Sequence, residues 1–194
     1  EEMQRRYAEE RERRLTPDRT RFERVNAVEG YDHDPYLPRQ EREPLTDEVD
    51  VIVVGGGLGG LLIGARLRDA GIERIRIVDY AGDFGGTWYW NRYPGAMCDL
   101  ESYIYMPLLE ELGYMPSQKY VLAPEIYRHA QALGRHYDLY RDACFHTAVT
   151  GARWDDGAQR WIVRTDRGDA MRAQFLCVAN GPLSSPKFPA IPGL

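Results

Sequence analysis

The sequence predicts an α/β fold in which a parallel sheet continues into an antiparallel β-meander. Two observations lead to this prediction. Apolar runs at 49–54 and 75–78 flank a segment with helical spacing of apolar residues, and short apolar runs alternate with turn signals over 145–179. The first run is short and nearly continuously apolar, as is typical of a parallel strand covered on both faces. Strand, helix and strand in this order form a β-α-β unit.

The first 45 residues are expected to form an extension that precedes this domain, which then occupies residues 46–194. Residues 1–24 are crowded with arginine and glutamate, and such mixed charge is typical of a solvent-exposed helix. Pro17 is expected to end that helix. Three prolines among charged residues between Gly30 and Pro44 favour an extended segment that lies over a surface.

Within the domain, the elements follow from periodicity and turn residues. After the strand at 49–54, apolar residues at helical spacing predict a helix that ends at Gly71, and a second strand follows at 75–78. Pro124 starts another helix, because proline is favoured in a first turn and the apolar residues after it share one face. The meander is predicted from strands at 145–154, 161–165 and 175–179, with turns at 155–157 and 167–168.

Composition excludes several classes of function. The 194 residues carry a net charge of −5, so no positive field favours nucleic acid as a partner. No apolar run reaches the ~18 residues of a membrane span, and the charged N-terminus does not resemble a signal peptide. The histidines lack metal-ligand spacing, and no serine lies in a nucleophile elbow. Three widely spaced cysteines predict reduced thiols and a cytoplasmic protein: Cys98, Cys144 and Cys177.

A glycine fingerprint lies between the first strand and the first helix of the domain. Gly55 permits a tight turn, Gly57 lets the backbone approach a pyrophosphate, and Gly60 allows the helix to pack closely on the strand. Asp79 ends the second strand, where an acid accepts hydrogen bonds from a ribose and repels a 2′-phosphate. The pattern therefore predicts a Rossmann-like domain that binds FAD or NAD rather than NADP, against the alternative of a glycine-rich turn without a ligand.

A second segment with candidate binding residues follows at 85–99. Adjacent glycines at 85 and 86 let backbone N–H groups approach a ligand, and four aromatic residues come directly after Thr87. Such rings are suited to lining a flavin, but they are equally typical of a core or a subunit interface. Asp99 closes the segment, either to orient a cationic partner beside the flavin or as a turn residue.

The order of these residues is more specific than their composition. The run Gly-Gly-Thr-Trp-Tyr-Trp-Asn-Arg-Tyr-Pro-Gly-Ala-Met-Cys-Asp at 85–99, followed by Glu-Ser-Tyr-Ile-Tyr at 101–105, strongly resembles Baeyer-Villiger monooxygenases, the class B flavoprotein monooxygenases. The resemblance extends from about Val49 to Leu194, and Ala179-Asn180-Gly181 resembles the family's second FAD contact. It implies an oxidoreductase in which NADPH reduces bound FAD, O₂ is captured as a C4a-peroxyflavin, and a ketone becomes an ester or lactone.

The resemblance also implies which residues contact the cofactor. By position these are Gly55, Gly57, Gly59, Gly60, Asp79, Gly86, Thr87, Trp88, Tyr89, Trp90, Asp99, Tyr105, Val149 and Gly181. Asp99 is the expected catalytic residue, since its counterpart in the family holds an arginine that stabilises the peroxyflavin anion and positions NADP.

The family's NADPH fingerprint and its arginine are expected beyond Leu194. The remainder of the enzyme is then a necessary partner, the FAD domain is incomplete, and residues 1–194 alone are expected to be inactive.

Two alternatives stay open. A related flavin monooxygenase that oxygenates nitrogen or sulfur needs the same cofactor. A noncatalytic FAD-binding or assembly module, in which residues 1–44 wrap a partner chain, is a hypothesis of another class.

Overall fold

The computed structural model describes residues 2–15, 22–24, 33–183 and 187–189, which fall into two compact units, Glu1–His33 with Ser185–Leu194 and Asp34–Ser184. In the smaller unit, α1 (Glu2–Arg14) buries none of its residues, as its charged sequence predicts. Strands β1 (Phe22–Arg24) and β8 (Lys187–Pro189) pair antiparallel. The predicted helix end at Pro17 lies outside the described residues.

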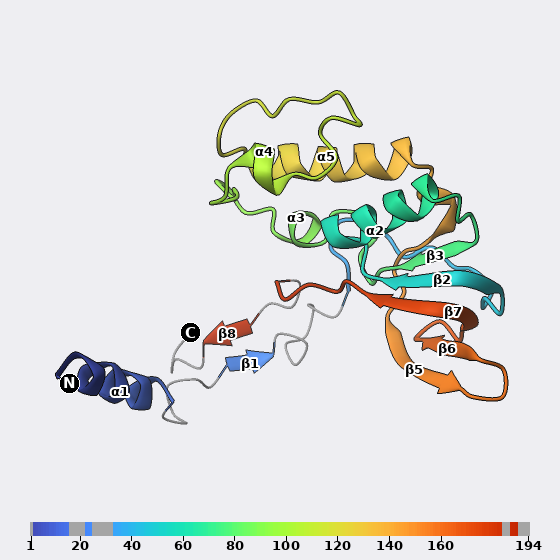
Figure 1. Ribbon diagram of the computed structural model, residues 1–194, viewed down its shortest axis with the longest axis horizontal. Coiled ribbons are helices and arrows are strands. Elements are labelled where there is room, and N and C mark those ends of the chain that lie inside the picture. Colours follow the sequence, from blue (N-terminus) through green and yellow to red (C-terminus); the bar gives the residue numbers. More distant parts are fainter. Residues whose placement is uncertain (1, 16–21, 25–32, 184–186, 190–194) are drawn as a thin grey trace. The chain divides into compact units, whose positions relative to one another are not determined.

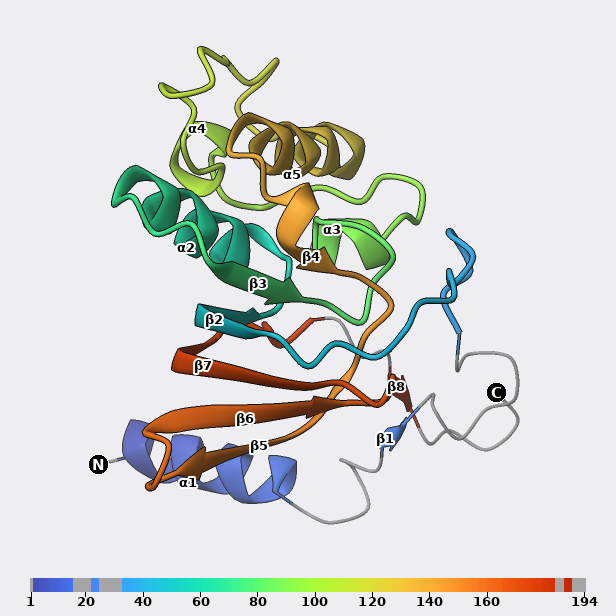
Figure 2. The same ribbon diagram turned by 90° about the vertical axis from the view of Figure 1, so that its right-hand side faces the viewer.

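The larger unit is built on a six-stranded sheet of order β4-β3-β2-β7-β6-β5 (Figure 2). Strands β2, β3, β4 and β7 run parallel, and β5, β6 and β7 form an antiparallel meander. The predicted α/β fold, a parallel sheet that continues into a meander, is thereby confirmed. The strand bounds are β2 Glu48–Val54, β3 Ile75–Val78, β4 Ala143–Cys144, β5 Val149–Asp155, β6 Arg160–Thr165 and β7 Ala170–Val178.

The helices of this unit lie on one side of the sheet (Figures 1 and 2). Those predicted from periodicity are present as α2 (Leu58–Asp69) and α5 (Ala123–His136). Two four-residue helices, α3 (Thr87–Trp90) and α4 (Ser102–Tyr105), were not predicted, because one turn shows no periodicity. No helix within the described ranges is both long and apolar enough to cross a membrane.

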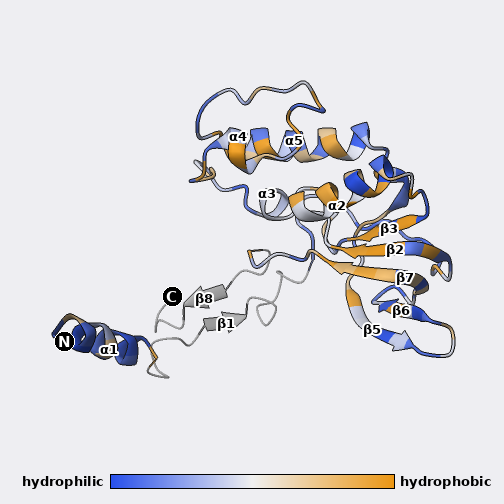
Figure 3. Cartoon of the chain, viewed as in Figure 1, coloured by the Kyte–Doolittle hydropathy of each residue, from blue (hydrophilic) through white to orange (hydrophobic). Residues whose placement is uncertain are grey.

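The central strands β2, β3 and β7 carry most of the apolar surface of the sheet, whereas α1 is hydrophilic (Figure 3). Val51 and Val53 of β2 pack with Leu61 of α2 and other side chains of the helical layer. Ile52, from the opposite face of β2, packs with Met171 and its neighbours in the meander. Both faces of β2 are therefore buried, and its C-terminal end is held in place relative to the helices and the meander.

Residues 34–45 have neither helix nor strand, as the prolines predict, and they are anchored to the meander by a partly buried ion pair. The Arg42 guanidinium donates to both carboxylate oxygens of Asp169, each at 2.6 Å. Asp169 also accepts from the Leu45 N–H at 2.7 Å and from the Thr165 hydroxyl at 2.6 Å. Its side chain is fully buried.

We expect Asp169→Asn to lower the free energy of unfolding by about 3 kcal/mol at neutral pH, because it leaves the Arg42 guanidinium without its charged partner. Burial raises the pKa of Asp169, but hydrogen bonds from Arg42, Leu45 and Thr165 outweigh it and lower the pKa to about 2. A carboxylate with a lowered folded pKa stabilises the fold above its unfolded pKa of about 4, and this stabilisation is lost as the pH falls toward 2.

Denaturant unfolding at several pH values measures this effect. The difference between wild type and Asp169→Asn should shrink between pH 5 and pH 2, and a difference that is constant with pH would show that the charge is not its source. Asp138→Asn is the control, because the Asp138 side chain is 68% exposed and its ion pair with Arg141 lies on the surface.

Candidate functional site

Three parallel strands end at one edge of the sheet, and a predicted site segment follows each of them. Val54 is in register with Val78 of β3 and with Val178 of β7. The next residues, Gly55, Asp79 and Ala179, therefore lie side by side. Ligands of α/β sheets bind at the carboxyl ends of the strands, so this edge is the candidate site.

The glycine loop has the geometry that its sequence pattern predicts. Gly55 has a φ of +110°, and a Cβ there would lie 2.4 Å from the Ala179 carbonyl oxygen. A Cβ on Gly60 would lie 1.8 Å from the Gly55 carbonyl oxygen. Gly57 is the N-cap of α2 and offers no side-chain cap, so the first-turn N–H groups of α2 point toward a ligand position. Such a helix start binds phosphate readily.

Asp79 holds the glycine loop in place. One carboxylate oxygen accepts from the Gly56 N–H, and the other accepts from the Ala81 N–H at 2.7 Å. Burial raises the pKa of Asp79, and the backbone hydrogen bonds, which lower the pKa, offset this effect only in part. Each oxygen keeps a further lone pair, so the carboxylate can also accept from a ribose hydroxyl.

The glycine loop contacts the segment that begins at Gly85. The Gly85 N–H donates to the Gly56 carbonyl oxygen at 2.9 Å. Gly86 has a φ of +54°, and a Cβ there would lie 2.8 Å from the Cα of Gly57. The two segments that the sequence singles out are therefore joined through backbone atoms, in a space that only glycine fits.

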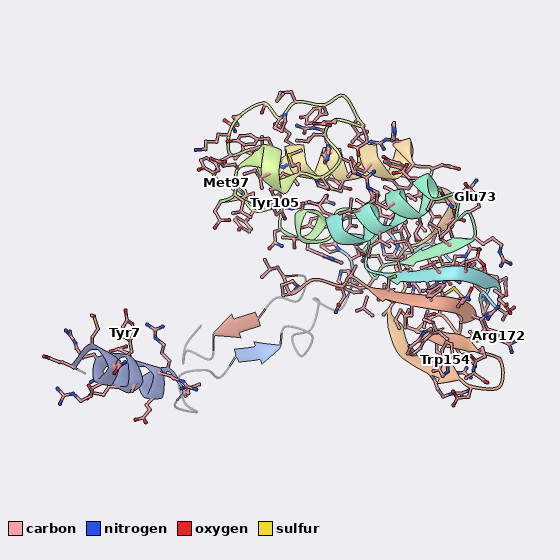
Figure 4. The ribbon with its side chains drawn as sticks, viewed as in Figure 1. Tyr7, Glu73, Met97, Tyr105, Trp154 and Arg172 are labelled. Atoms are coloured by element: carbon pink, nitrogen blue, oxygen red, sulfur yellow. The ribbon has the colours of Figure 1, made fainter. Side chains whose placement is uncertain are left out.

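The aromatic residues of α3 take different positions. Trp88 is buried, and its indole N–H donates to the Tyr105 hydroxyl at 2.9 Å. Tyr105 is the last residue of α4 (Figure 4). Tyr89 is fully buried, whereas the half-buried Trp90 stacks on Tyr80 with ring centroids 4.8 Å apart. The sequence left open whether these rings pack in the core or bind a ligand. Both roles are compatible with this one short helix, because its rings have different surroundings.

The remaining predicted site residues surround this edge. Asp99 is exposed, and its carboxylate makes no hydrogen bond or ion pair within the described part of the chain. Burial raises the pKa of Tyr105, and the negative charge of Asp99 adds to this effect. Val149 opens β5 two residues after Thr147, whose N–H donates to the Asp79 carbonyl oxygen at 2.9 Å. Gly181 is exposed with a φ of +58°, and Gly59 is exposed on the first turn of α2.

Sequence reasoning missed two buried carboxylates behind α3. Asp83 accepts from the hydroxyls of Tyr127 at 2.7 Å and Tyr140 at 2.8 Å. Asp34 accepts from the Tyr89 hydroxyl at 2.5 Å. The Asp-Pro pair at 34–35 is a turn signal that points to Asp34, and its carboxylate does accept from the Tyr36 N–H at 2.9 Å. No local signal indicates Asp83.

Comparisons with known proteins agree with this geometry. The profile of NAD(P)-binding Rossmann-like domains matches residues 53–113. Pentalenolactone D synthase of Streptomyces exfoliatus is 56% identical over 99% of this chain and 33% of its own length. A Baeyer-Villiger monooxygenase of Streptomyces coelicolor is 52% identical over 99% of this chain and 32% of its own length.

Among solved structures, the polycyclic ketone monooxygenase of the fungus Thermothelomyces thermophila superposes with a TM-score of 0.86 at 37% identity. The match covers 98% of this chain and 34% of that enzyme. The chain thus spans about one third of the length of the relatives that it matches.

Proposed function

Because the chain belongs to the Baeyer-Villiger monooxygenase family, we propose that it is the FAD-binding part of an NADPH- and O₂-dependent monooxygenase that converts ketones to esters or lactones. In this proposal residues 46–194 contribute to the FAD domain, and residues 1–45 are an extension whose last part, residues 34–45, is anchored to it by Arg42. The free thiols of Cys98, Cys144 and Cys177 support a cytoplasmic location.

The observation that carries the proposal is the backbone contact between Gly56 and Gly85. It brings an anion-binding helix start within reach of a helix that bears tryptophans, which is the arrangement that a dinucleotide with a flavin ring requires. A site for diphosphate alone has no need of the second segment.

The residues divide the binding of FAD among them. The first-turn N–H groups of α2 bind the diphosphate, and Asp79 accepts from the adenosine ribose. Bound FAD supplies the electron-transfer and oxygen chemistry. Asp99 holds a cationic group beside the flavin, which its free carboxylate permits. The flavin half is contacted by Gly86, Thr87, Trp88, Trp90, Tyr105, Val149 and Gly181, with Tyr89 behind them.

Gly86→Ala is expected to weaken FAD binding at least ~10-fold, equivalent to about 1.4 kcal/mol, because its Cβ would push α3 away from Gly57. Gly95→Ala is the matched control. Gly95 also has a positive φ, of +80°, but a Cβ there meets no atom within 4 Å. It shares the conformational cost of alanine without the clash and should bind FAD normally. Equal FAD dissociation constants for the two variants would contradict the proposed contact.

The activity is tested on the full-length protein. We expect a yellow protein with one FAD per chain that oxidises NADPH faster with a cyclic ketone and yields a lactone by mass spectrometry. A preference for an organic sulfide or amine would instead support the nitrogen- or sulfur-oxygenating alternative. FAD binding without NADPH oxidation would support a noncatalytic module, and a protein that stays colourless with added FAD would overturn the proposal.

A further inference from the structure

Asp34 is a hydrogen-bond centre that the proposed cofactor contacts leave unexplained. Its Oδ1 accepts from the backbone N–H groups of Tyr36 at 2.9 Å and Leu37 at 3.4 Å. Its Oδ2 accepts from the Gly82 N–H at 2.9 Å, from the Tyr89 hydroxyl at 2.5 Å and from His146 Nε2 at 2.9 Å. One carboxylate thus joins segments that are distant in sequence.

This centre is enclosed and closely packed. The side chain of Asp34 is 4% exposed and that of His146 is 11% exposed. A Cβ on Gly82 would lie 2.6 Å from His146 Nε2 and 2.8 Å from Asp34 Oδ2, so the loop leaves no room for a side chain. Five donors converge on the Asp34 carboxylate, and its position is therefore well defined.

The protonation states follow from the same surroundings. Burial alone raises the pKa of Asp34, but hydrogen bonds from Tyr89, Tyr36, His146 and Leu37 together hold that pKa below its ordinary value. Burial and the adjacent carboxylate raise the pKa of Tyr89 far above its ordinary value. Asp34 is therefore an ionised acceptor and Tyr89 a neutral donor at neutral pH, a charge-assisted and correspondingly strong pairing.

The same segment holds α3 at a second point. The Tyr36 hydroxyl donates to the Trp90 carbonyl oxygen at 3.1 Å, and the Tyr36 ring meets the Tyr89 ring edge-on with centroids 5.6 Å apart. The Arg92 guanidinium lies 3.8 Å from the centre of the Tyr36 ring and 4.6 Å from that of Tyr89. Residues 34–36 therefore contact α3 at two points, the Tyr89 side chain and the Trp90 carbonyl oxygen.

We propose that Asp34 is a positioning residue, which acts through Tyr89 to fix the orientation of α3 and hence of the flavin contacts of Trp88 and Trp90. The inference rests on the proposed function. It gives the segment that contains Asp34 a role in the cofactor site, whereas the sequence predicted only an extended segment that lies over a surface.

The test compares Asp34→Asn and Tyr89→Phe, singly and together, in the full-length protein. Each single change is expected to raise the FAD dissociation constant ~10-fold and to alter the visible circular dichroism of bound flavin. The double variant should be no worse than either single one, because both remove the same interaction. If Asp34→Asn does not fold, Tyr89→Phe, which removes only a hydroxyl, carries the test.

Asp169→Asn is the matched control. It makes the same carboxylate-to-amide change and loosens the same segment, through Arg42 and Leu45, but Asp169 has no partner in α3. A merely structural role of Asp34 predicts that both variants lose thermal stability while FAD affinity and the flavin spectrum stay unchanged. That result, or fully additive effects of Asp34→Asn and Tyr89→Phe, overturns the inference. A wild-type protein that binds no FAD overturns the proposed function instead.

Discussion

Gly60→Ala is expected to abolish FAD binding and to lower the free energy of unfolding by more than about 4 kcal/mol, at the upper end of single substitutions. The added Cβ would lie 1.8 Å from the carbonyl oxygen of Gly55 and 2.9 Å from its carbonyl carbon. Both are backbone atoms that no rotamer change can move. The clash is relieved only if α2 moves away from β2, which dismantles the phosphate loop and exposes Leu61. Thermal unfolding and the flavin content of the purified protein measure both effects.

Gly59→Ala is the control for this prediction. Gly59 lies on the same turn of α2 but is exposed, and a Cβ there would meet only the Ala179 side chain at an ordinary 3.8 Å. Because alanine favours a helix over glycine by about 1 kcal/mol, this variant should fold at least as well as wild type. Equal thermal midpoints for the two variants would show that Gly60 is not required for close packing.

The sequence predicts the fold well where the pattern is long enough. Apolar periodicity places β2, α2, β3 and α5, and turn residues place the meander. The two residues of β4 and the single turns of α3 and α4 carry no periodicity, so only the structure reveals them. The strand predicted from Phe145 begins at Val149, because residues 145–148 turn through His146, whose φ is +48°.

The candidate site is predicted in part. The glycine loop and Asp79 follow from local spacing and from the known geometry of a β-α-β crossover. The contact between Gly56 and Gly85 and the partners of Asp34 do not, because they depend on tertiary packing. Tyr89 lies 55 positions from Asp34, and His146 lies 112 positions from it. A single sequence indicates that Tyr89 is aromatic and close to the site, but not that its hydroxyl donates to the Asp34 carboxylate.

Asp99→Asn is expected to lower kcat for ketone oxidation about 10²- to 10³-fold while FAD stays bound, because the cation that Asp99 holds would lose its fixed position and no longer stabilise the developing negative charge. Asp99 is exposed, yet the neighbouring Cys98 is buried in the same cluster as Trp88, so the backbone that carries the carboxylate is fixed relative to α3. A carboxylate that is fixed but unpartnered within residues 33–183 is suited to hold a cation that the reaction needs. Asparagine keeps the shape of the side chain and removes only this charge.

Glu101→Gln separates a specific role of Asp99 from the general charge of its segment. Glu101 lies two residues away and is also acidic, but its carboxylate already accepts from Lys119 at 2.7 Å and from the Tyr103 hydroxyl at 2.8 Å. Glu101→Gln removes one negative charge from the same segment. Because exposed ion pairs contribute little interaction free energy, this change should lower kcat less than about twofold. Similar losses of kcat in both variants would show that the total negative charge of this segment matters, and not Asp99 in particular. Full activity of Asp99→Asn would contradict the prediction, because it would show that the cation does not depend on the Asp99 carboxylate.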